Sequence, residues 1–271
     1  MNNKIVKATV NYYQKFDTDY SLDVPAEGCG GWKRAEIELD LSHTAVVVMH
    51  AWDCGTPEQY PGLYRAIEYI PRANDIVRKV FPPLLGAVRR SGMRLYHVVG
   101  GNDQYYKQYP GFQRASRLAG PAAGLETVTV DSGLEKLRRF RADHWHGPHN
   151  QDDCAAAFRR FDFPPEAKPE GDEGVAENAA QLFALCKADG ITHLIYAGFA
   201  INVCLLMMSG GMIDMWRRGF ICSALRQAVT AAENKESARQ GLHKEEALWR
   251  VAMFFGFVFD VDDFIAVIRV P

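Results

Sequence analysis

The sequence predicts a three-layer α/β protein, in which helices cover both faces of a mostly parallel sheet of about six strands. Two features predict this Rossmann-type class. Short β-branched apolar runs, such as TAVVVMH (44–50) and ITHLIYAG (191–198), are typical of strands buried on both faces. Segments with helical periodicity that end at glycine alternate with these runs, and this alternation is typical of parallel strands joined by helices.

The elements follow one another along a single predicted domain, residues 1–271. A polar N-terminal extension (1–42) ends in RAEIELDLS, which alternates like an edge strand. Proline at 82 and 83 is expected to turn or kink the first long helix, and Gly92 to end it. The further predicted strands cover 93–101, 191–198, 220–225 and 257–261, and the predicted helices cover 70–91, 174–190, 200–219 and 243–256.

Residues 102–166 interrupt this rhythm and are too long for an ordinary connection. They contain a candidate strand ETVTVD (126–131), a short basic helix around LEKLRRFRADH (134–144) and the polar loop HGPHNQDD (146–153). We interpret them as an inserted lid or oligomerisation element.

Composition excludes several classes of protein. The 271 residues are 48% hydrophobic, which excludes overall disorder, and the formal net charge of -2 gives no field to attract nucleic acid or an anionic membrane. No signal-peptide run and no CxxC pair accompany the six cysteines, so we expect reduced thiols and a cytoplasmic protein. No phosphate-binding glycine motif or G-x-S-x-G elbow is present, and no cofactor is expected.

Cys204 is the leading candidate nucleophile. It lies about six residues past the strand 191–198, in the opening turn of a predicted helix. Free N–H groups and partial positive charge at a helix N-terminus favour a thiolate and can bind an oxyanion. Its neighbours are all apolar, so a buried structural cysteine is the alternative.

The string AGFAINVCLLMM around Cys204 resembles the G-x-A-T-x-x-C-V element of the cysteine hydrolase (isochorismatase-like) superfamily. IPRANDIV and HKEEALWR resemble two further family elements, and the resemblance covers most of residues 44–265. It implies that Cys204 is the nucleophile, that the Phe199–Ala200 peptide is cis, and that the N–H groups of Ala200 and Cys204 bind the oxyanion. Ile201 stands where the family usually has threonine, which marks a divergent member.

The resemblance also implies two partners for the cysteine, an aspartate that closes the first strand and a lysine. Lys168 is the lysine candidate, and its alternative is a solvated loop residue. In VVMHAWDCG, His50 occupies the place of the aspartate, while Trp52 and Asp53 match a D-M-W-D variant of the family. Either His50 replaces the base, or Asp53 reaches into the site, or the site is inactive.

Side chains after the second strand are candidates for substrate binding. We assign Asp103 and Tyr105 to this role together with Trp52 and Ile201, although Tyr105, Tyr106, Tyr109 and Phe112 could equally anchor the insertion. His144, His146 and His149, near Asp143, Asp152 and Asp153, are weak metal candidates against the alternative of a polar surface loop.

The resemblance implies hydrolysis of a small amide-like C–N bond through an acyl-enzyme on Cys204. The alternatives are an isochorismatase-type vinyl-ether hydrolase, which needs no cysteine nucleophile, and an inactive binding or scaffold protein. The expected partners are a small-molecule substrate and further copies of the chain, since family members commonly form dimers or larger assemblies. Neither nucleic acid nor a membrane is expected.

Overall fold

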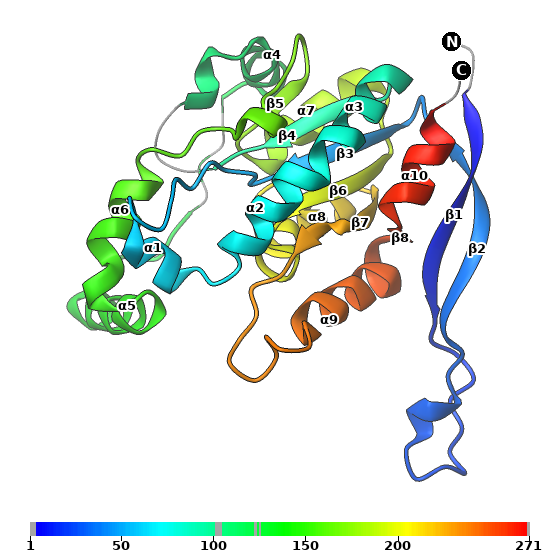
Figure 1. The fold of residues 1–271 in the computed structure, drawn as a ribbon, viewed down its shortest axis with the longest axis horizontal. Helices are drawn as coiled ribbons and strands as arrows, with labels where there is room; N and C mark the ends of the chain where they lie inside the picture. Colours follow the sequence, from blue (N-terminus) through cyan, green and yellow to red (C-terminus); the bar gives the residue numbers. More distant parts are fainter. Residues whose placement is uncertain (1–3, 101–104, 122–123, 125, 270–271) are drawn as a thin grey trace.

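The computed structural model describes residues 4–100, 105–121, 124 and 126–269. Asp103, one of the candidate binding residues, lies outside this part of the chain. Figure 1 shows a twisted sheet with helices on both sides, so the predicted three-layer α/β class is confirmed.

The sheet has eight strands in the order β2-β1-β8-β7-β6-β3-β4-β5. Six of them are parallel to one another: β3 (Thr44–Met49), β4 (Arg94–Val98), β5 (Gly174–Ala176), β6 (His193–Phe199), β7 (Ile221–Thr230) and β8 (Val258–Phe259). An antiparallel hairpin of β1 (Ile5–Gln14) and β2 (Gly31–Asp40) joins one edge. The sequence analysis had expected about six strands and had not recognised β1 or β5.

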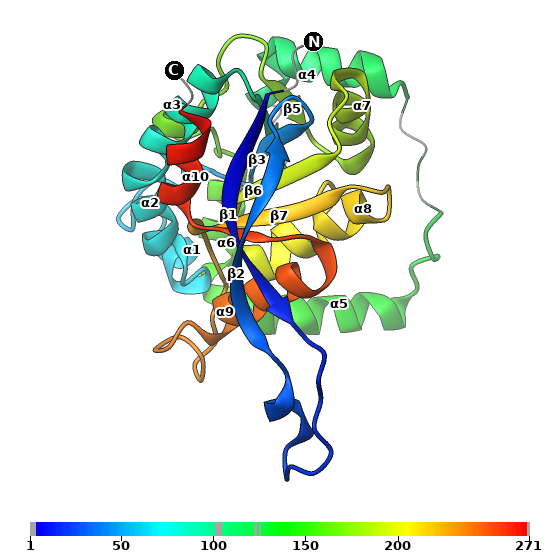
Figure 2. The same cartoon turned by 90° about the vertical axis from the view of Figure 1, so that its right-hand side faces the viewer.

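Two apolar layers hold helices against the sheet (Figures 1 and 2). Helices α2, α3 and α10 cover one face, and α4, α7, α8 and α9 cover the other. The helices are α1 (Pro61–Ala66), α2 (Ile70–Lys79), α3 (Phe81–Ser91), α4 (Pro110–Ala119), α5 (Ser132–Trp145), α6 (Gln151–Phe158), α7 (Ala179–Asp189), α8 (Met212–Trp216), α9 (Leu242–Arg250) and α10 (Val261–Ile268). None of these helices, which belong to the described residues, is long and apolar enough to span a bilayer.

The predicted helix 70–91 is divided at Val80 into α2 and α3. Pro82 and Pro83 occupy the first turn of α3, where the missing N–H groups break no hydrogen bond. Gly92 ends α3 with φ 78°, a left-handed conformation that favours glycine, as predicted.

The prediction of a single helix over residues 200–219 is wrong. A five-residue π-helical turn, Ile201–Leu205, is followed by a separate α8. Gly210 has φ 86°, and a Cβ on Gly211 would lie within 3 Å of the carbonyl oxygens of Cys204, Leu205 and Met208. The chain therefore folds back on itself here, and only glycine permits the close approach.

Other boundaries also differ from the prediction. Residues 174–176 form β5 rather than the start of a helix, residues 243–256 form α9 and a second π-helical turn (Val251–Phe255), and α10 follows β8. ETVTVD is exposed coil, not a strand. HGPHNQDD is not a loop, because it forms a 3₁₀ turn (Pro148–Asn150) and the start of α6.

Part of the insertion packs over the carboxyl ends of the strands. Helix α6 contacts α1, and Asp153 accepts a hydrogen bond from Gly62 N at 2.6 Å. Leu63, Cys154 and Phe161 form the centre of a small apolar cluster between them. This cluster places the insertion beside the candidate site.

Candidate active site

The candidate site begins where β3 and β6 end side by side. Met49 pairs with Gly198, so His50, which follows β3, and Phe199, the last residue of β6, lie at adjacent positions. Gly198 has φ 123°, and a Cβ there would lie 1.9 Å from the Met49 carbonyl oxygen. The backbones of the two strands therefore approach so closely that only glycine fits.

Cys204 lies in the turn that follows β6. The Phe199–Ala200 peptide bond is cis, the conformation that the resemblance implied. The Ala200 carbonyl accepts hydrogen bonds from Val203 N at 3.2 Å and Leu205 N at 3.1 Å, which closes the turn around Cys204. The side chain is 9% exposed and belongs to the apolar layer of α7 and α8.

The Cys204 thiol is not activated as the sequence analysis expected. Burial raises the pKa of the Cys204 thiol, and a hydrogen bond with the Ala200 backbone offsets only part of this effect. The π-helical turn is also too short to supply the dipole of a full helix. The cysteine is therefore a neutral thiol at neutral pH.

His50 is held in an unusual conformation at the end of β3. Its φ is 54°, and its backbone N–H donates to Val98 O at 2.9 Å, which fixes it between β3 and β4. Its ring stacks on Trp52 with 4.5 Å between centroids. Burial lowers the pKa of His50 to about 4, so the ring is neutral at pH 7. Among the described residues, Nδ1 of His50 has no hydrogen-bond partner.

Asp53 and Lys168 are not directed at Cys204. Asp53 is exposed; its N–H donates to Asp162 O at 2.8 Å, and its carboxylate accepts from Gly55 N at 3.0 Å. Lys168 is exposed, and its carbonyl accepts from Arg89 in the last turn of α3. Since α3 leads into the amino end of β4, Lys168 lies near the amino ends of the strands. Cys204, in contrast, follows the carboxyl end of β6.

A cavity of about 30 Å³ lies beside His50. Aromatic rings fill most of the space, and Trp52 stacks on Phe161 with 4.9 Å between centroids. No lysine or arginine is among the described residues that line it. They are His50, Trp52, Cys54, Ile67, Tyr69, Ile70, Ala73, Asn74, Phe158, Phe161 and Phe199.

Tyr69 is a site residue that the sequence analysis missed. It lines this cavity, and it is close enough to Cys204 for the cysteine to affect the pKa of its hydroxyl. Burial, and to a smaller extent Cys204, raises the pKa of Tyr69, so it remains a hydrogen-bond donor. The only signal in the sequence was its position just before the IPRAND segment.

The candidate binding residues Trp52, Tyr105 and Ile201 do not all line the cavity. Trp52 lines the cavity and donates from Nε1 to the Tyr105 hydroxyl at 3.0 Å. Tyr105 also packs edge-on against Phe163, in a cluster that joins the insertion to the sheet. Ile201 is fully buried in the apolar layer. Tyr105 therefore supports Trp52 rather than facing the cavity.

The histidines of the insertion do not converge on one point. His144 Nδ1 lies 2.8 Å from the Phe140 carbonyl oxygen, and its ring stacks on Phe140. His146 lies near Phe158, and burial lowers its pKa. Within the described ranges, no three histidine, cysteine or acidic side chains are grouped to hold a metal ion.

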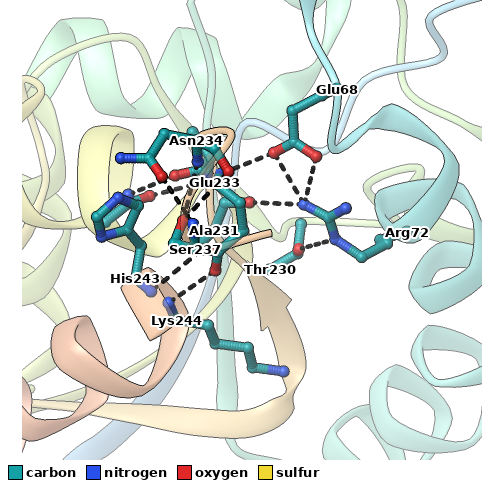
Figure 3. Close-up of polar contacts among 11 residues, drawn as sticks. Glu68, Arg72, Thr230, Ala231, Glu233, Asn234, Ser237, His243 and Lys244 are labelled. Atoms are coloured by element: carbon teal, nitrogen blue, oxygen red, sulfur yellow. Dashed lines mark hydrogen bonds and ion pairs between the residues drawn. The ribbon is translucent and has the colours of Figure 1, made fainter. Parts of the chain in front are cut away.

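A polar loop after β7 supports the Cys204 turn and was also missed. The side-chain amide of Asn202 donates to Ala232 O at 2.8 Å and accepts from Ala232 N at 2.9 Å. Figure 3 shows that Arg72 of α2 reaches Glu68 and the Ala231 carbonyl, which ties this loop to α2.

The same loop begins α9. Glu233 accepts hydrogen bonds from His243 N at 3.1 Å and Lys244 N at 3.0 Å, so its carboxylate satisfies two N–H groups at the start of the helix (Figure 3). The Glu233 N–H in turn donates to Glu68 at 2.7 Å. Spacing in the sequence could not have revealed a cap that lies nine residues before the first residue of the helix.

Comparisons with known proteins agree with this architecture. No family model matches the chain. A stretch of 91 residues is 31% identical to the ureidoacrylate amidohydrolase RutB of Serratia proteamaculans, covering 34% of this chain and 33% of that protein. The chain thus spans about a third of the length of this curated relative.

Solved structures match over a larger share of the chain. A cysteine hydrolase from Pseudomonas syringae pv. phaseolicola matches with a TM-score of 0.52 and 16% identity, over 85% of this chain and 94% of that one. An isochorismatase family protein from Burkholderia thailandensis matches with a TM-score of 0.47 and 15% identity, over 84% and 97%. The first of these matches shows that the chain has the fold of the Pseudomonas syringae cysteine hydrolase.

Proposed function

We propose that the chain is a hydrolase that cleaves a small amide-like C–N bond, with Cys204 as the nucleophile and His50 as the general base. The observation that carries the proposal is the turn after β6, in which the cis Phe199–Ala200 peptide leads into the π-helical turn that contains Cys204. His50 ends the neighbouring strand β3 and lines the adjoining cavity. The fold of a cysteine hydrolase and the short match to an amidohydrolase support the same chemistry.

The charge state of the pair determines the mechanism. Both the Cys204 thiol and the His50 imidazole are neutral at pH 7. In the proposed first step, His50 takes the thiol proton while the sulfur attacks the substrate carbonyl. The N–H groups of Ala200 and Cys204 stabilise the oxyanion. The protonated imidazole then gives its proton to the departing amine, which leaves an acyl-enzyme on Cys204.

Hydrolysis of the acyl-enzyme completes the cycle. His50 takes a proton from a water molecule as that water attacks the thioester carbonyl, and the proton returns to the sulfur when the acid leaves. No hydrogen bond joins Cys204 to His50 among the described residues, so the proposed proton transfer requires the two side chains to approach each other when substrate binds. Such tightening between free and bound forms is usual for catalytic hydrogen bonds.

The cavity indicates the kind of substrate. Its walls are aromatic, while Asn74 and His50 provide polar groups. A small planar compound with an amide or ureido group combines an apolar face with hydrogen-bonding atoms, as such walls require. The ureido group is also the chemistry named for the relative from Serratia proteamaculans. Entry of any such compound requires the rings of Phe158 and Phe161 to move, since the cavity between these rings and His50 measures only about 30 Å³.

The test is turnover of a panel of small N-carbamoyl compounds and carboxamides, measured as release of ammonia or amine. We expect activity in the wild type, its loss in Cys204→Ala, and a decrease of about 10²- to 10⁴-fold in His50→Ala. Cys186→Ala is the matched control, because it removes another buried thiol from the same apolar layer. Equal activity of Cys204→Ala and Cys186→Ala would refute the covalent mechanism and favour hydrolysis of a vinyl ether or another route without the thiol.

A second candidate function, an inactive binding protein, has its own supporting observation. The cavity is almost filled, and Lys168 lies near the opposite edge of the sheet, so the charged partners that the family needs are not gathered at the cysteine. A panel without any turnover, in a chain that unfolds cooperatively, would favour this function. Phe161→Leu would then enlarge the cavity without producing activity.

A further inference from the structure

The β1–β2 hairpin extends well beyond the sheet. β1 pairs with β8 at one position, Asn11 with Val258, and both strands then continue into solvent as an arm (Figures 1 and 2). We define the hairpin tip as residues 15–30. The tip is held by its own hydrogen bonds, such as Asp19 N to Pro25 O at 3.0 Å.

The hairpin tip exposes an apolar and acidic surface. Phe16 is 64% exposed and Tyr20 is 88% exposed. Leu22 and Val24 are exposed as well. Apolar side chains gathered on a protruding element are typical of a surface that binds another protein. The acidic side chains of the tip are Asp17, Asp19, Asp23 and Glu27, against a single lysine, Lys15.

Helix α5 exposes a surface of the opposite charge. None of its 14 residues is buried, and Leu137, Phe140 and Trp145 are 69%, 64% and 61% exposed. A helix of this length without a packed face is marginal in water, so α5 needs a covering surface. Its basic side chains, all exposed, are Lys136, Arg138, Arg139 and Arg141, against two acidic ones, Glu135 and Asp143.

The two surfaces do not meet within one chain. Figure 1 shows α5 at one end of the molecule and the arm at the other, and Figure 2 shows the hairpin tip separate from α5 as well. The complementary partner of each surface is therefore available only on another molecule.

We propose that the hairpin tip of one copy docks on helix α5 of a second copy. The acidic tip residues then face the basic residues of α5, and Phe16 and Tyr20 pack against Leu137 and Phe140. In a two-fold symmetric dimer the contact forms twice, because each copy offers one tip and one helix. Opposite charge on the two surfaces sets the register, and the aromatic side chains provide the buried area.

The test is the mass of the full-length chain in solution, from light scattering and sedimentation at low and high salt. We expect a dimer that weakens as salt is added, because the contact is partly electrostatic. The tip variant Asp19→Lys with Asp23→Lys, and the helix variant Arg138→Glu with Arg139→Glu, should each weaken dimerisation by at least about tenfold. Mixing the two variants should restore a dimer that neither forms alone.

The restoration on mixing distinguishes this contact from any other. Lys187→Glu with Arg217→Glu changes the same charge at exposed positions outside both surfaces and should leave the dimer intact. A monomeric wild type, a dimer that survives the tip variant, or a mixture that stays monomeric overturns the proposal. Binding of a monomer to anionic phosphatidylserine vesicles through α5 also overturns it, in favour of a membrane surface.

Discussion

Replacing His50 with asparagine should make the protein less sensitive to acid. Burial lowers the pKa of His50 from 6.5 to about 4, so the unfolded chain binds a proton more readily than the folded one between these values. The resulting stability is fully present above pH 6.5 and is lost as the pH falls toward 4. Between pH 7 and pH 5 the loss is about 2 kcal/mol, and below pH 4 it approaches about 3 kcal/mol.

The assay is urea unfolding of wild type and His50→Asn at pH 7 and pH 5. Asparagine cannot be protonated here and tolerates the positive φ of this position, so the variant should fold. The free energy of unfolding should fall by about 2 kcal/mol more in the wild type than in the variant between pH 7 and pH 5. Burial also lowers the pKa of His193 to about 4. His193 is present in both proteins, so its contribution to the acid sensitivity cancels in the comparison.

A control shows whether the effect belongs to this position. His149 is exposed, so His149→Asn removes no buried imidazole and should keep the acid sensitivity of the wild type. Equal losses in wild type and His50→Asn would refute the reasoning, because His50 would then be hydrated and not enclosed by Trp52 and Phe161.

Two further predictions concern the backbone around the site. Gly198→Ala should lower the free energy of unfolding by more than about 4 kcal/mol, because the new Cβ would meet the Met49 carbonyl. The control Gly219→Ala is also at positive φ but has open space around it, so its free energy of unfolding should fall by only about 1–2 kcal/mol. Thermal unfolding measures both variants. Glu233→Gln should cost about 1 kcal/mol through the weakened cap of α9, while the exposed Glu236→Gln should be neutral; equal unfolding midpoints for these two variants would contradict the cap.

The parallel core and the position of Cys204 could be predicted from the sequence because each depends on short-range patterns. Buried strands such as 44–50 and 191–198 are marked by uninterrupted apolar runs, and Gly92 marks a helix end. The order of strands and helices then places the residue after β6 at the carboxyl edge of the sheet, whatever the exact boundaries. The divergence at His50 was visible in the sequence for the same reason, since no gap separates it from the strand.

The remaining features depend on contacts between distant segments. The polar residues of IVKATVNYYQ concealed β1, whose inward side chains Ala8 and Val10 are buried in the apolar layer that contains α10, at the far end of the sequence. The spacing of Lys168 suggested a site residue, but spacing gives no direction to a loop, and this one runs toward the amino edge. Tyr69 reaches Cys204 from α2, across more than a hundred residues of sequence.

The two departures from the family pattern are physically consistent with each other. The resemblance implies a buried aspartate and a lysine near the cysteine, two opposite charges that can share a cavity because each compensates the other. Losing only one of them would leave an unpaired charge in a nearly dry, aromatic pocket, at a cost of several kcal/mol. This chain has a neutral histidine at the aspartate position, no lysine or arginine among the described residues lining the cavity, and a neutral thiol. The site therefore stays uncharged until a reaction moves a proton, and for this reason the mechanism that we propose begins with proton transfer from Cys204 to His50 and not with a preformed thiolate.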